Sequence, residues 1–519
     1  MLTPSYLLHA VEPAEEIAEK LHIDILSRII ERIMIRFKRG DDYVLTAVDK
    51  WQIETLQEAG FLLEDIQKEI ATATGRMSKE VAEAMEDAGV RALDYDDAIY
   101  REMGMDPVPL VQSPYMMTLM QDTYTQTMGE WRNFTNISKR AIHNMFVEAC
   151  DTAYMQAMSG AISPSQAYLE ALEKVVEGGV YVQYPGGRRD TIETATARAV
   201  RTGISQASGR IQIARMDEMD VDLVLVSSHL GARPEHYVWQ GKIYSRSGGG
   251  DYPDFVESTR YGYVDGLCGA NCRHNFSPYF EGMKNPFQEY DSEENQKQYE
   301  LEQRQRTLER RIRDTKRQTM GWKTAMDAED DPVKKAELEE KYQRKAALLQ
   351  KQNKAYNDFC ESTGQKKRSD RINIAKWDRK QAASARSAAK KWNERENPQG
   401  ITVAFTRNNG KIKVLDVGRS VGAASKKYSV KMPASRDHVR LAEGQSIEGK
   451  TFAGKGTKTE IRERYKLEVA YKKPADSFEK VCGNGYVIVD GKKRHAELHW
   501  YESGNEVFEM KVKRFLDEG

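Results

Sequence analysis

Apolar residues recur at helical spacing along the first part of the chain. Between residues 12 and 38, Leu21, Ile25, Ile29 and Ile33 follow one another at every fourth position. This spacing places them on one face of an α-helix that can bury its apolar side. Residues 1–175 are therefore predicted to be almost entirely helical. Further helices are expected over residues 47–71, 78–93, 117–128 and 137–158.

A helix start is marked at residues 163–166. Ser163 has the side chain of an N-cap, Pro164 suits the first helical position, and Gln166 completes a capping box. After Gly178 the pattern changes to short alternating segments and turn residues, which predicts a loop-rich α+β region. Its expected elements are strands at 181–184 and 221–227, a helix at 192–219, and short strands between 227 and 283.

Residues 289–396 are strongly polar and are predicted to form two long helices. Apolar residues such as Leu301 and Leu308 recur at a spacing close to 3.5, but polar residues interrupt the series. Asp331 followed by Pro332 marks the start of the second helix. Two interpretations stay open: a helical hairpin or coiled-coil spacer that self-associates, and solvated charged helices without a partner. Linkers are expected at residues 363–372 and 381–400.

The C-terminal part of the chain has an α+β pattern of short alternating segments. The predicted fold class is therefore multidomain. It comprises a mainly α N-terminal half, a small α+β loop-rich region, a long helical hairpin or coiled-coil spacer, and a C-terminal α+β domain. The corresponding boundaries are 1–176, 177–285, 286–396 and 397–519. In the last domain, strands are expected at 401–405, 411–417 and 427–430, a helix at 457–467, and a meander at 485–489, 495–501 and 507–514.

The charge balance argues against a protein that binds nucleic acid over its whole surface. The chain has 79 Lys and Arg residues and 79 Asp and Glu residues, so its formal net charge is +0. Any nonspecific DNA contact would have to use local basic runs such as residues 366–368 and 390–391. The neighbours of these runs include many acids, and a solvated helix face explains the same pattern.

The cysteine count and the hydropathy limit the compartment. Five cysteines in 519 residues do not make a disulfide scaffold, and they suit the reducing cytoplasm. No apolar run is long enough to span a bilayer, and the N-terminus lacks the pattern of a signal peptide. We therefore expect no membrane association.

A group of histidines and cysteines lies in the loop-rich region. Imidazoles and thiolates are the ligands that zinc prefers, so this group could hold a structural zinc ion. The Cys268 and Cys272 spacing is wider than a zinc knuckle, however, and buried loop residues or a disulfide remain alternatives. No P-loop motif is present, so nucleotide hydrolysis is not indicated. The candidate metal ligands are His229, His236, Cys268, Cys272 and His274.

Three sequence runs carry a resemblance to a known family. Arg198 and Arg201 precede the Asp-Glu-Met run at 217–219, HLGARPEHYVWQG follows at 229–241, and CGANCRH follows at 268–274. Together with LTAVDKWQIETLQEAG at 45–60, they resemble the phage minor capsid protein 2 family, related to Mu F-like head proteins. The resemblance covers about residues 1–285. The matching positions are Arg233, His236, Trp239, Gly241, Cys268, Asn271, Cys272 and His274.

The resemblance implies a structural protein of a tailed-phage head. Such a protein would assemble in the host cytoplasm, remain in the virion, and contact the portal and capsid proteins during head assembly, DNA packaging or ejection. On this interpretation the histidines and cysteines brace a loop, and no enzymatic activity is expected of the N-terminal half.

A second candidate site lies in the C-terminal meander. Strand alternation places His495, Glu497 and His499 on one face, and Lys513 is expected to point outward from the next strand. Metal-independent ribonucleases need a general base, a general acid and a cation of this kind. The module also loosely resembles barnase–EndoU–colicin–RelE-type nuclease modules. A phage-delivered effector with a C-terminal nuclease is therefore the alternative function, and an ordinary half-solvated sheet face is the simpler explanation.

Overall fold

The computed structural model divides into two compact units. The first contains Met1–Thr324 and Lys351–Asp378, and the second contains Ala325–Gln350 and Arg379–Gly519. The finer division into four parts stays a prediction. The structure describes residues 1–38, 48–184, 186–396, 403–408, 411–417, 439–442, 445–489, 492–504 and 506–517.

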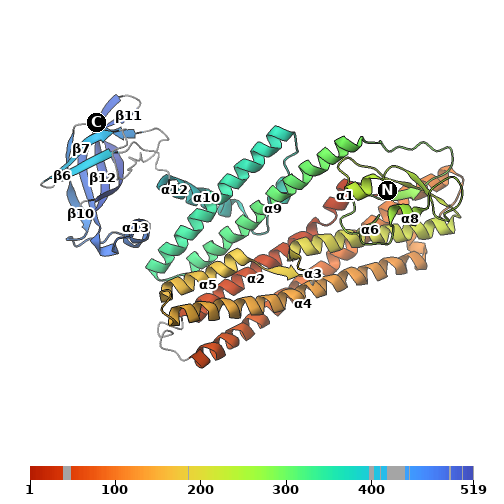
Figure 1. Cartoon of the computed structure of the whole chain (residues 1–519), viewed down its shortest axis with the longest axis horizontal. Helices are drawn as coiled ribbons and strands as arrows, with labels where there is room; N and C mark the ends of the chain where they lie inside the picture. The colour runs from red at the N-terminus through yellow and green to blue at the C-terminus, as the bar shows by residue number, and fades with distance from the viewer. Residues whose placement is uncertain are drawn as a thin grey trace. The chain divides into compact units, whose positions relative to one another are not determined.

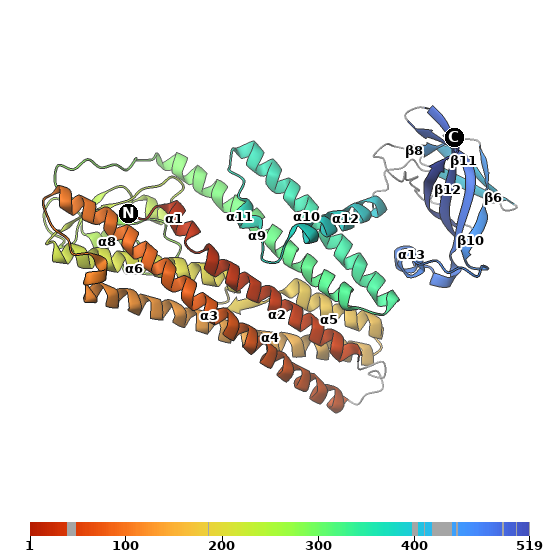
Figure 2. The same ribbon diagram turned by 180° about the vertical axis from the view of Figure 1, so that it is seen from behind.

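The first unit is built on a bundle of long helices. Figures 1 and 2 show α2, α3, α4, α5 and α6 from opposite viewpoints, running along one another. A short first helix precedes them. The bounds are α1 Pro4–His9, α2 Glu12–Lys38, α3 Val48–Glu102, α4 Pro114–Met158, α5 Pro164–Gly178 and α6 Ile192–Glu218.

The apolar stripe of α2 forms the centre of this bundle, as predicted. Ile25, Ile29 and Ile33 are fully buried. At the end of the helix, the Phe37 ring packs edge-on against Trp51 of α3, with ring centroids 5.6 Å apart. Trp51 in turn stacks on Tyr154 of α4 at 4.4 Å. Aromatic contacts therefore join three helices at one end of the core.

The helices α3 and α4 are each continuous where the sequence pattern suggested two shorter helices. The predicted break after residue 71 is wrong, because α3 runs without interruption through Gly75. A glycine in an exposed helix interior costs only about 1 kcal/mol relative to alanine. Buried Ile66, Met77 and Val81 on both sides of it keep the helix packed against its neighbours. The predicted break between residues 128 and 137 is wrong in the same way.

One glycine of α6 permits an especially close helix crossing. A Cβ atom at Gly203 would lie 2.2 Å from the Thr127 hydroxyl of α4 and 2.7 Å from the Met85 methyl of α3. No side chain fits in that space, so the α6 backbone packs directly against both helices.

Two predicted helix starts are capped as expected. The Gln166 backbone N–H donates to the Ser163 hydroxyl at 3.1 Å. The Gln166 side chain binds Glu170 instead of returning to the cap, so only half of the capping box forms. The Asp331 carboxylate accepts from the Lys334 N–H at 2.9 Å, which begins the second polar helix.

The loop-rich region surrounds two very small sheets. Strands β1 Tyr181–Gln183 and β2 Arg189–Thr191 pair antiparallel, and β3 Leu223–Val226 is flanked antiparallel by β4 and β5. The remaining elements of this region are β4 Ile243–Ser245, β5 Phe276–Pro278, α7 Pro234–Tyr237 and α8 Phe255–Thr259, whereas the 3-10 turn η2 Leu110–Gln112 lies between α3 and α4.

The polar helices are α9 Ser292–Ala328 and α10 Pro332–Thr363. In the first unit, the end of α10 runs antiparallel to α9. The Tyr356 hydroxyl of α10 contacts Gln305 and Glu309 of α9, and Cys360, one turn later on α10, also contacts Gln305. A Cβ at Gly321 of α9 would lie 3.1 Å from Val176 of α5, so α9 also packs on the bundle. The sequence pattern did not predict this packing, because the sequence of α9 is strongly polar and rich in charged residues.

Part of one predicted linker is a helix. In the second unit, α12 Arg379–Glu396 buries Ala385, Ala388 and Ala389. The linker prediction for residues 381–396 is therefore wrong, and residues 397–400 lie outside the described part. In the other predicted linker, a single turn, α11 Ser369–Ile372, interrupts an otherwise irregular segment.

The C-terminal module is built on an antiparallel sheet. Its strand order is β10-β11-β12-β13, with β8 also paired to β11, and a second sheet has the order β6-β7-β9. The predicted meander is confirmed. The helix predicted at 457–467 begins later, at Arg464. The strand predicted at 427–430 lies outside the described residues. The bounds are β6 Val403–Asn408, β7 Lys411–Val417, β8 Val439–Leu441, β9 Ser446–Glu448, β10 Lys450–Gly454, α13 Arg464–Tyr471, η3 Ala475–Ser477, β11 Glu479–Val489, β12 Lys492–Ser503 and β13 Glu506–Phe515.

A bulge in β13 divides side chains that simple alternation would place together. Glu509 has a φ of 48°, and the register between β12 and β13 shifts between His499 and Tyr501. Phe508 consequently packs with Tyr501 on one face, while Met510 joins the core on the other face. Strand alternation without the bulge would have placed Phe508 and Met510 on the same face.

Among the described residues, no helix is both long enough and apolar enough to cross a membrane.

Candidate functional site

The loops around β3 bring the histidines and cysteines of the sequence motifs together. Arg233 and His236 lie at α7, and Trp239 and Gly241 precede β4. Four further motif residues lie in the loop that leads into β5. The apolar core beneath them contains Val224, Val226, Trp239, Phe255, Cys268, Cys272 and Phe276.

The loop before β5 is folded tightly on itself. A Cβ at Gly266 would lie 1.9 Å from the Arg260 carbonyl oxygen, so no other residue fits there. Cys268 and Asn271 have φ angles of 60° and 58°, in the left-handed region. These tight turns direct Cys268 and Cys272 into the interior.

Three of the five candidate metal ligands share one small space. One potential ligand atom from each of His236, Cys272 and His274 lies within 4.8 Å of the others, and all three residues are buried. Within this group, the Cys272 sulfur is 3.7 Å from Nδ1 of His274. These three residues could hold a metal ion such as zinc.

The other two candidate ligands have different surroundings. The His229 ring stacks on the His274 ring, with centroids 4.4 Å apart, and its Nδ1 lies 3.1 Å from the Leu230 carbonyl. The Cys268 sulfur lies close to Gly209 of α6, where a Cβ would be 3.4 Å away. Of the five metal ligands predicted from the sequence, three therefore form one group, and the other two, His229 and Cys268, lie beside it.

Burial controls the protonation of the cluster. It lowers the pKa of both His229 and His236 to about 4, and it lowers that of His274 as well. Burial also raises the pKa of the Cys268 and Cys272 thiols, which are free. The imidazoles are therefore neutral and the thiols protonated near neutral pH, so these cysteines are poor nucleophiles.

Protein groups already occupy most hydrogen-bonding positions of the cluster. His274 Nε2 is 3.0 Å from the Gln240 side-chain oxygen, so this nitrogen carries the proton. His236 Nε2 lies 2.9 Å from the Asp265 carbonyl and 2.7 Å from the Arg233 guanidinium. A proton on Nε2 satisfies the carbonyl, whereas the arginine contact requires a lone pair there. In either arrangement these bonds brace the loop without a further ligand.

The second candidate site lies on the exposed face of β12. Glu497 is held from two sides, by His499 Nε2 at 2.8 Å and by Arg514 Nε at 2.7 Å. These two hydrogen bonds lower the pKa of Glu497, with His499 contributing most, so the carboxylate is a weaker base than usual. His495 lies apart from this trio and stacks on Tyr486 at 4.8 Å.

The cation opposite Glu497 is an arginine, where the sequence suggested Lys513. In the strand register Glu497 faces Arg514 and Leu498 faces Val512, so Lys513 occupies the bulge between them and is exposed. Strand alternation alone cannot reveal such a bulge, and this is why the sequence indicated the neighbouring residue.

A comparison with known protein families matches most of the chain. The model of the family described as phage minor capsid protein 2 matches residues 2–360. The chain belongs to this family. The match includes both the helical bundle and the histidine and cysteine cluster, which makes the cluster part of the family region of this minor capsid protein.

A relative of this minor capsid protein comes from another phage. It is named "Structural protein" of Lactococcus phage LL-H and is 22% identical over 322 residues, which cover 59% of this chain and 84% of the relative. No solved structure matches the chain significantly. The family and the relative together support a structural role in a phage.

The family region also contains a buried ion network that the sequence did not reveal. Arg317 of α9 binds Glu193 of α6 at 2.7 Å and Glu19 of α2 at 3.4 Å, and it also contacts Asp314. His22 Nδ1 lies 2.9 Å from the second Glu193 oxygen. Although burial alone would raise the pKa of Glu193, these cationic and hydrogen-bonding partners lower it. The only local signal was a set of charges within helical stripes, which usually indicates a solvated face.

Proposed function

We propose that this minor capsid protein is a structural component of the phage head, located near the portal, that contributes to head assembly, DNA packaging or ejection. Family membership over residues 2–360 is the observation that carries this proposal. The name of the relative supports it. The chemistry of the histidine and cysteine cluster agrees with it, because neutral imidazoles and protonated thiols brace a loop instead of attacking a substrate.

The connection between α3 and α4 offers a surface for contact with another head protein. Val111 is 73% exposed and Tyr115 is 63% exposed, and Met103, Val108 and Met117 nearby are also exposed. Tyr115 and Met117 belong to the first turn of α4 and the others to the connection itself. Large apolar side chains exposed together on one short segment mark an interaction site in many proteins. We assign this surface to contact with a neighbouring protein of the head.

Analysis of purified particles tests this proposal. The polypeptide should be present in mature particles by mass spectrometry. Val111→Asp with Tyr115→Asp should reduce its incorporation several-fold while leaving the melting temperature of the isolated protein unchanged. Val264→Asp is the matched control, because Val264 is equally exposed on a different loop. Absence of the wild-type polypeptide from particles would reject the proposal.

The alternative function is phosphodiester cleavage by the C-terminal module. The observation that favours it is the trio of His499, Glu497 and Arg514, which combines an imidazole, a carboxylate and a guanidinium on one exposed face. The full chain would be incubated with total RNA beside the variants His499→Ala and Arg514→Gln. Cleavage lost in both variants would establish this activity. Intact RNA with the wild-type chain would leave the module with a binding or assembly role.

A further inference from the structure

A charged cavity of about 400 Å³ lies in the first unit, apart from the histidine and cysteine cluster. That volume is within the range of small-molecule sites. Four parts of the chain line it: the α1–α2 region, Arg201 of α6, Arg313 of α9, and residues 368–378. These segments are far apart in sequence, so the cavity exists only in the folded unit.

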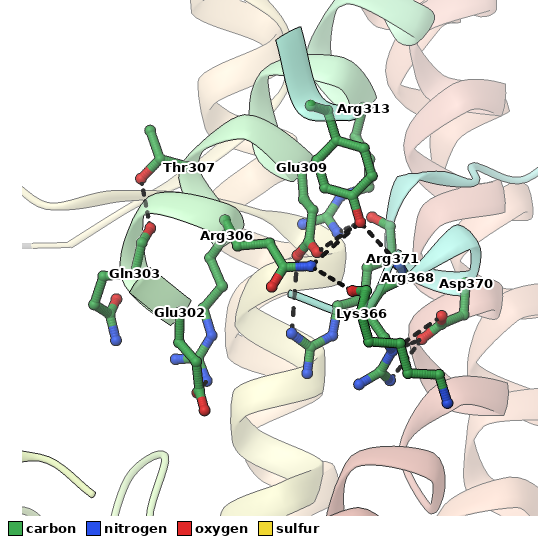
Figure 3. Close-up of polar contacts among 12 residues, drawn as sticks. Glu302, Gln303, Arg306, Thr307, Glu309, Arg313, Lys366, Arg368, Asp370 and Arg371 are labelled. Atoms are coloured by element: carbon green, nitrogen blue, oxygen red, sulfur yellow. Dashed lines mark hydrogen bonds and ion pairs between the residues drawn. The ribbon is translucent and has the colours of Figure 1, made fainter. Parts of the chain in front are cut away.

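One wall of the cavity is a strap, residues 364–378, that follows α10. Its backbone is fixed by side chains of the neighbouring helices. The Gln305 amide donates to the Lys366 carbonyl at 2.9 Å, and the Arg368 N–H donates to the Tyr356 hydroxyl at 2.8 Å. Figure 3 shows this network beside Arg368 and Arg371. The strap therefore holds its two arginines at fixed positions next to α9.

Further bonds continue along the strap toward the bundle. Arg313 donates to the Arg371 carbonyl at 2.7 Å, and the Lys316 ammonium donates to the Ile372 carbonyl at 2.6 Å. The Ala375 N–H donates to the Glu19 carboxylate at 2.9 Å. The cavity wall is thus irregular in backbone but held at many points, which is the preorganisation that a binding site needs.

Three arginines of the cavity have guanidinium groups that protein acceptors do not saturate. The contact found for Arg201 is a single 3.3 Å bond to the Leu7 carbonyl, and the Nε of Arg313 is buried without an acceptor. The nearest carboxylate to Arg371 is Glu309 at 3.8 Å, too far for a good hydrogen bond (Figure 3). Arg368, in contrast, is paired with Asp370 at 2.7 Å.

The arginines also disfavour one another's charge. Burial lowers the pKa of Arg201 to about 10, and although Glu15 opposes this, Arg306 and Arg371 lower it further. Burial lowers the pKa of Arg371 as well, with a contribution from Arg368. Like charges held together at a partly buried site are unfavourable unless an anion joins them.

The cavity also carries acidic side chains, most of them on the wall opposite the strap. They are Glu12, Glu15, Glu16 and Glu19 of α2 and Asp370 and Asp378 of the strap. Glu19 is satisfied by Arg317 and the strap, but Glu15 has no ion pair within 4 Å in the described part of the chain. Burial raises the pKa of Glu15. A ligand that filled the cavity would therefore meet guanidinium groups on one side and several carboxyl groups on the other, and any of these that are ionised oppose an anion.

We propose that this cavity binds a phosphate group, free or carried by a nucleotide or the end of a DNA strand, through Arg201, Arg313 and Arg371. A tetrahedral phosphate has enough oxygens to accept from three guanidinium groups at once, whereas one carboxylate matches one guanidinium. Trp377 also lines the cavity, and the Lys316 ammonium lies 5.5 Å from the centroid of its ring. A nucleotide base would have to stack on the part of the ring that Lys316 leaves uncovered. Duplex DNA is far too wide to enter a cavity of this volume, so a strand would enter only by its end.

Calorimetry and thermal unfolding of the full chain test this site. The probes are inorganic phosphate, a nucleoside monophosphate, and a short DNA strand with or without a 5′-phosphate, each against chloride at matched ionic strength. Binding of phosphate and a rise in melting temperature are expected. Tighter binding of the nucleotide or of the phosphorylated strand would identify the source of the group. No binding by any of these probes would overturn the proposal.

Variants separate this site from general charge effects. Arg313→Gln and Arg371→Gln should each weaken phosphate binding roughly tenfold or more, the value of one charged hydrogen bond. Glu15→Gln should strengthen binding, because it removes a carboxylate that opposes the anion. Arg310→Gln is the matched control, since Arg310 is an exposed residue of the same helix. Equal loss in Arg310→Gln, or unchanged binding in both cavity variants, would contradict the assignment.

Discussion

Two arginines four residues apart on α9 have opposite surroundings. Arg317 meets Glu193, Glu19 and Asp314, and its charge is fully compensated inside the bundle. Arg313, one turn earlier, meets a carbonyl oxygen of the strap and faces the cavity. The two residues have the same chemistry and lie on the same helix. Carboxylates contributed by α2 and α6 decide which arginine is structural and which is available to a ligand.

Removal of each arginine in turn is the strongest test of this comparison. Arg317→Ala leaves Glu193 buried without its main cationic partner, and should lower the free energy of unfolding by about 3–5 kcal/mol. Arg313→Ala should change it by less than about 1 kcal/mol, because repulsion among the cavity arginines falls as the bond to Arg371 is lost. Urea unfolding of both variants measures the difference. Equal losses would show that the two sites are energetically alike.

Glu19 binds Arg317 and also lines the cavity, so it belongs to both sites. The pH dependence of the free energy of unfolding tests its role. Burial, with help from Glu193, raises the pKa of Glu19 to about 7. A carboxyl whose pKa is raised in the folded state stabilises below its unfolded pKa and loses that contribution as pH rises toward 7. From pH 5 to pH 7 this residue should therefore reduce stability, by at most about 1.4 kcal/mol per pH unit. Glu19→Gln should flatten that slope in urea unfolding at several pH values.

The histidine and cysteine cluster differs from both the Arg317 network and the cavity. Protein groups already bond to most of its polar atoms, so few of them are available to a ligand. Cys272→Ala should cost about 1–2 kcal/mol, the value of a small buried side chain and a weak hydrogen bond. Elemental analysis should find zinc well below one equivalent per chain, because Arg233 lies against His236 and three ligands are fewer than a structural zinc site uses. A full equivalent of zinc, lost in Cys272→Ala, would contradict this expectation.

The exposed trio on β12 should give the smallest effect. Arg514 is 71% exposed, so its bond to Glu497 competes with water and salt. Arg514→Gln should change the free energy of unfolding by no more than about 0.5 kcal/mol. Thermal unfolding at low and high salt measures this. A loss comparable to that of Arg317→Ala would show that the trio is part of the structural core.

The sequence predicted those features that a short stretch of residues determines. The stripe of α2, the cap at Ser163 and the helix start at Asp331 are local patterns, and the structure contains them. Continuous α3 was missed because a single exposed glycine looks like a helix end when its buried neighbours are unknown. The bulge at Glu509 was missed because alternation assumes a constant register.

The candidate sites also differ in whether their residues are close together in the sequence. The histidines and cysteines were recognised because they are close in sequence and uncommon, although the structure brings only three of them to one point. The arginine-lined cavity was missed because its residues come from α2, α6, α9 and the strap. Each arginine alone resembles an ordinary solvated residue, and only the tertiary structure shows that they converge.

The strap has a consequence for how such a chain can change over time. Its path is determined mainly by bonds from surrounding side chains to its backbone, at Lys366, Arg368, Arg371, Ile372 and Ala375. Backbone atoms are present whatever side chain a position carries. Substitutions at residues 368 and 371 can therefore change the charge of the cavity wall while the backbone bonds that fix the path of the strap are kept.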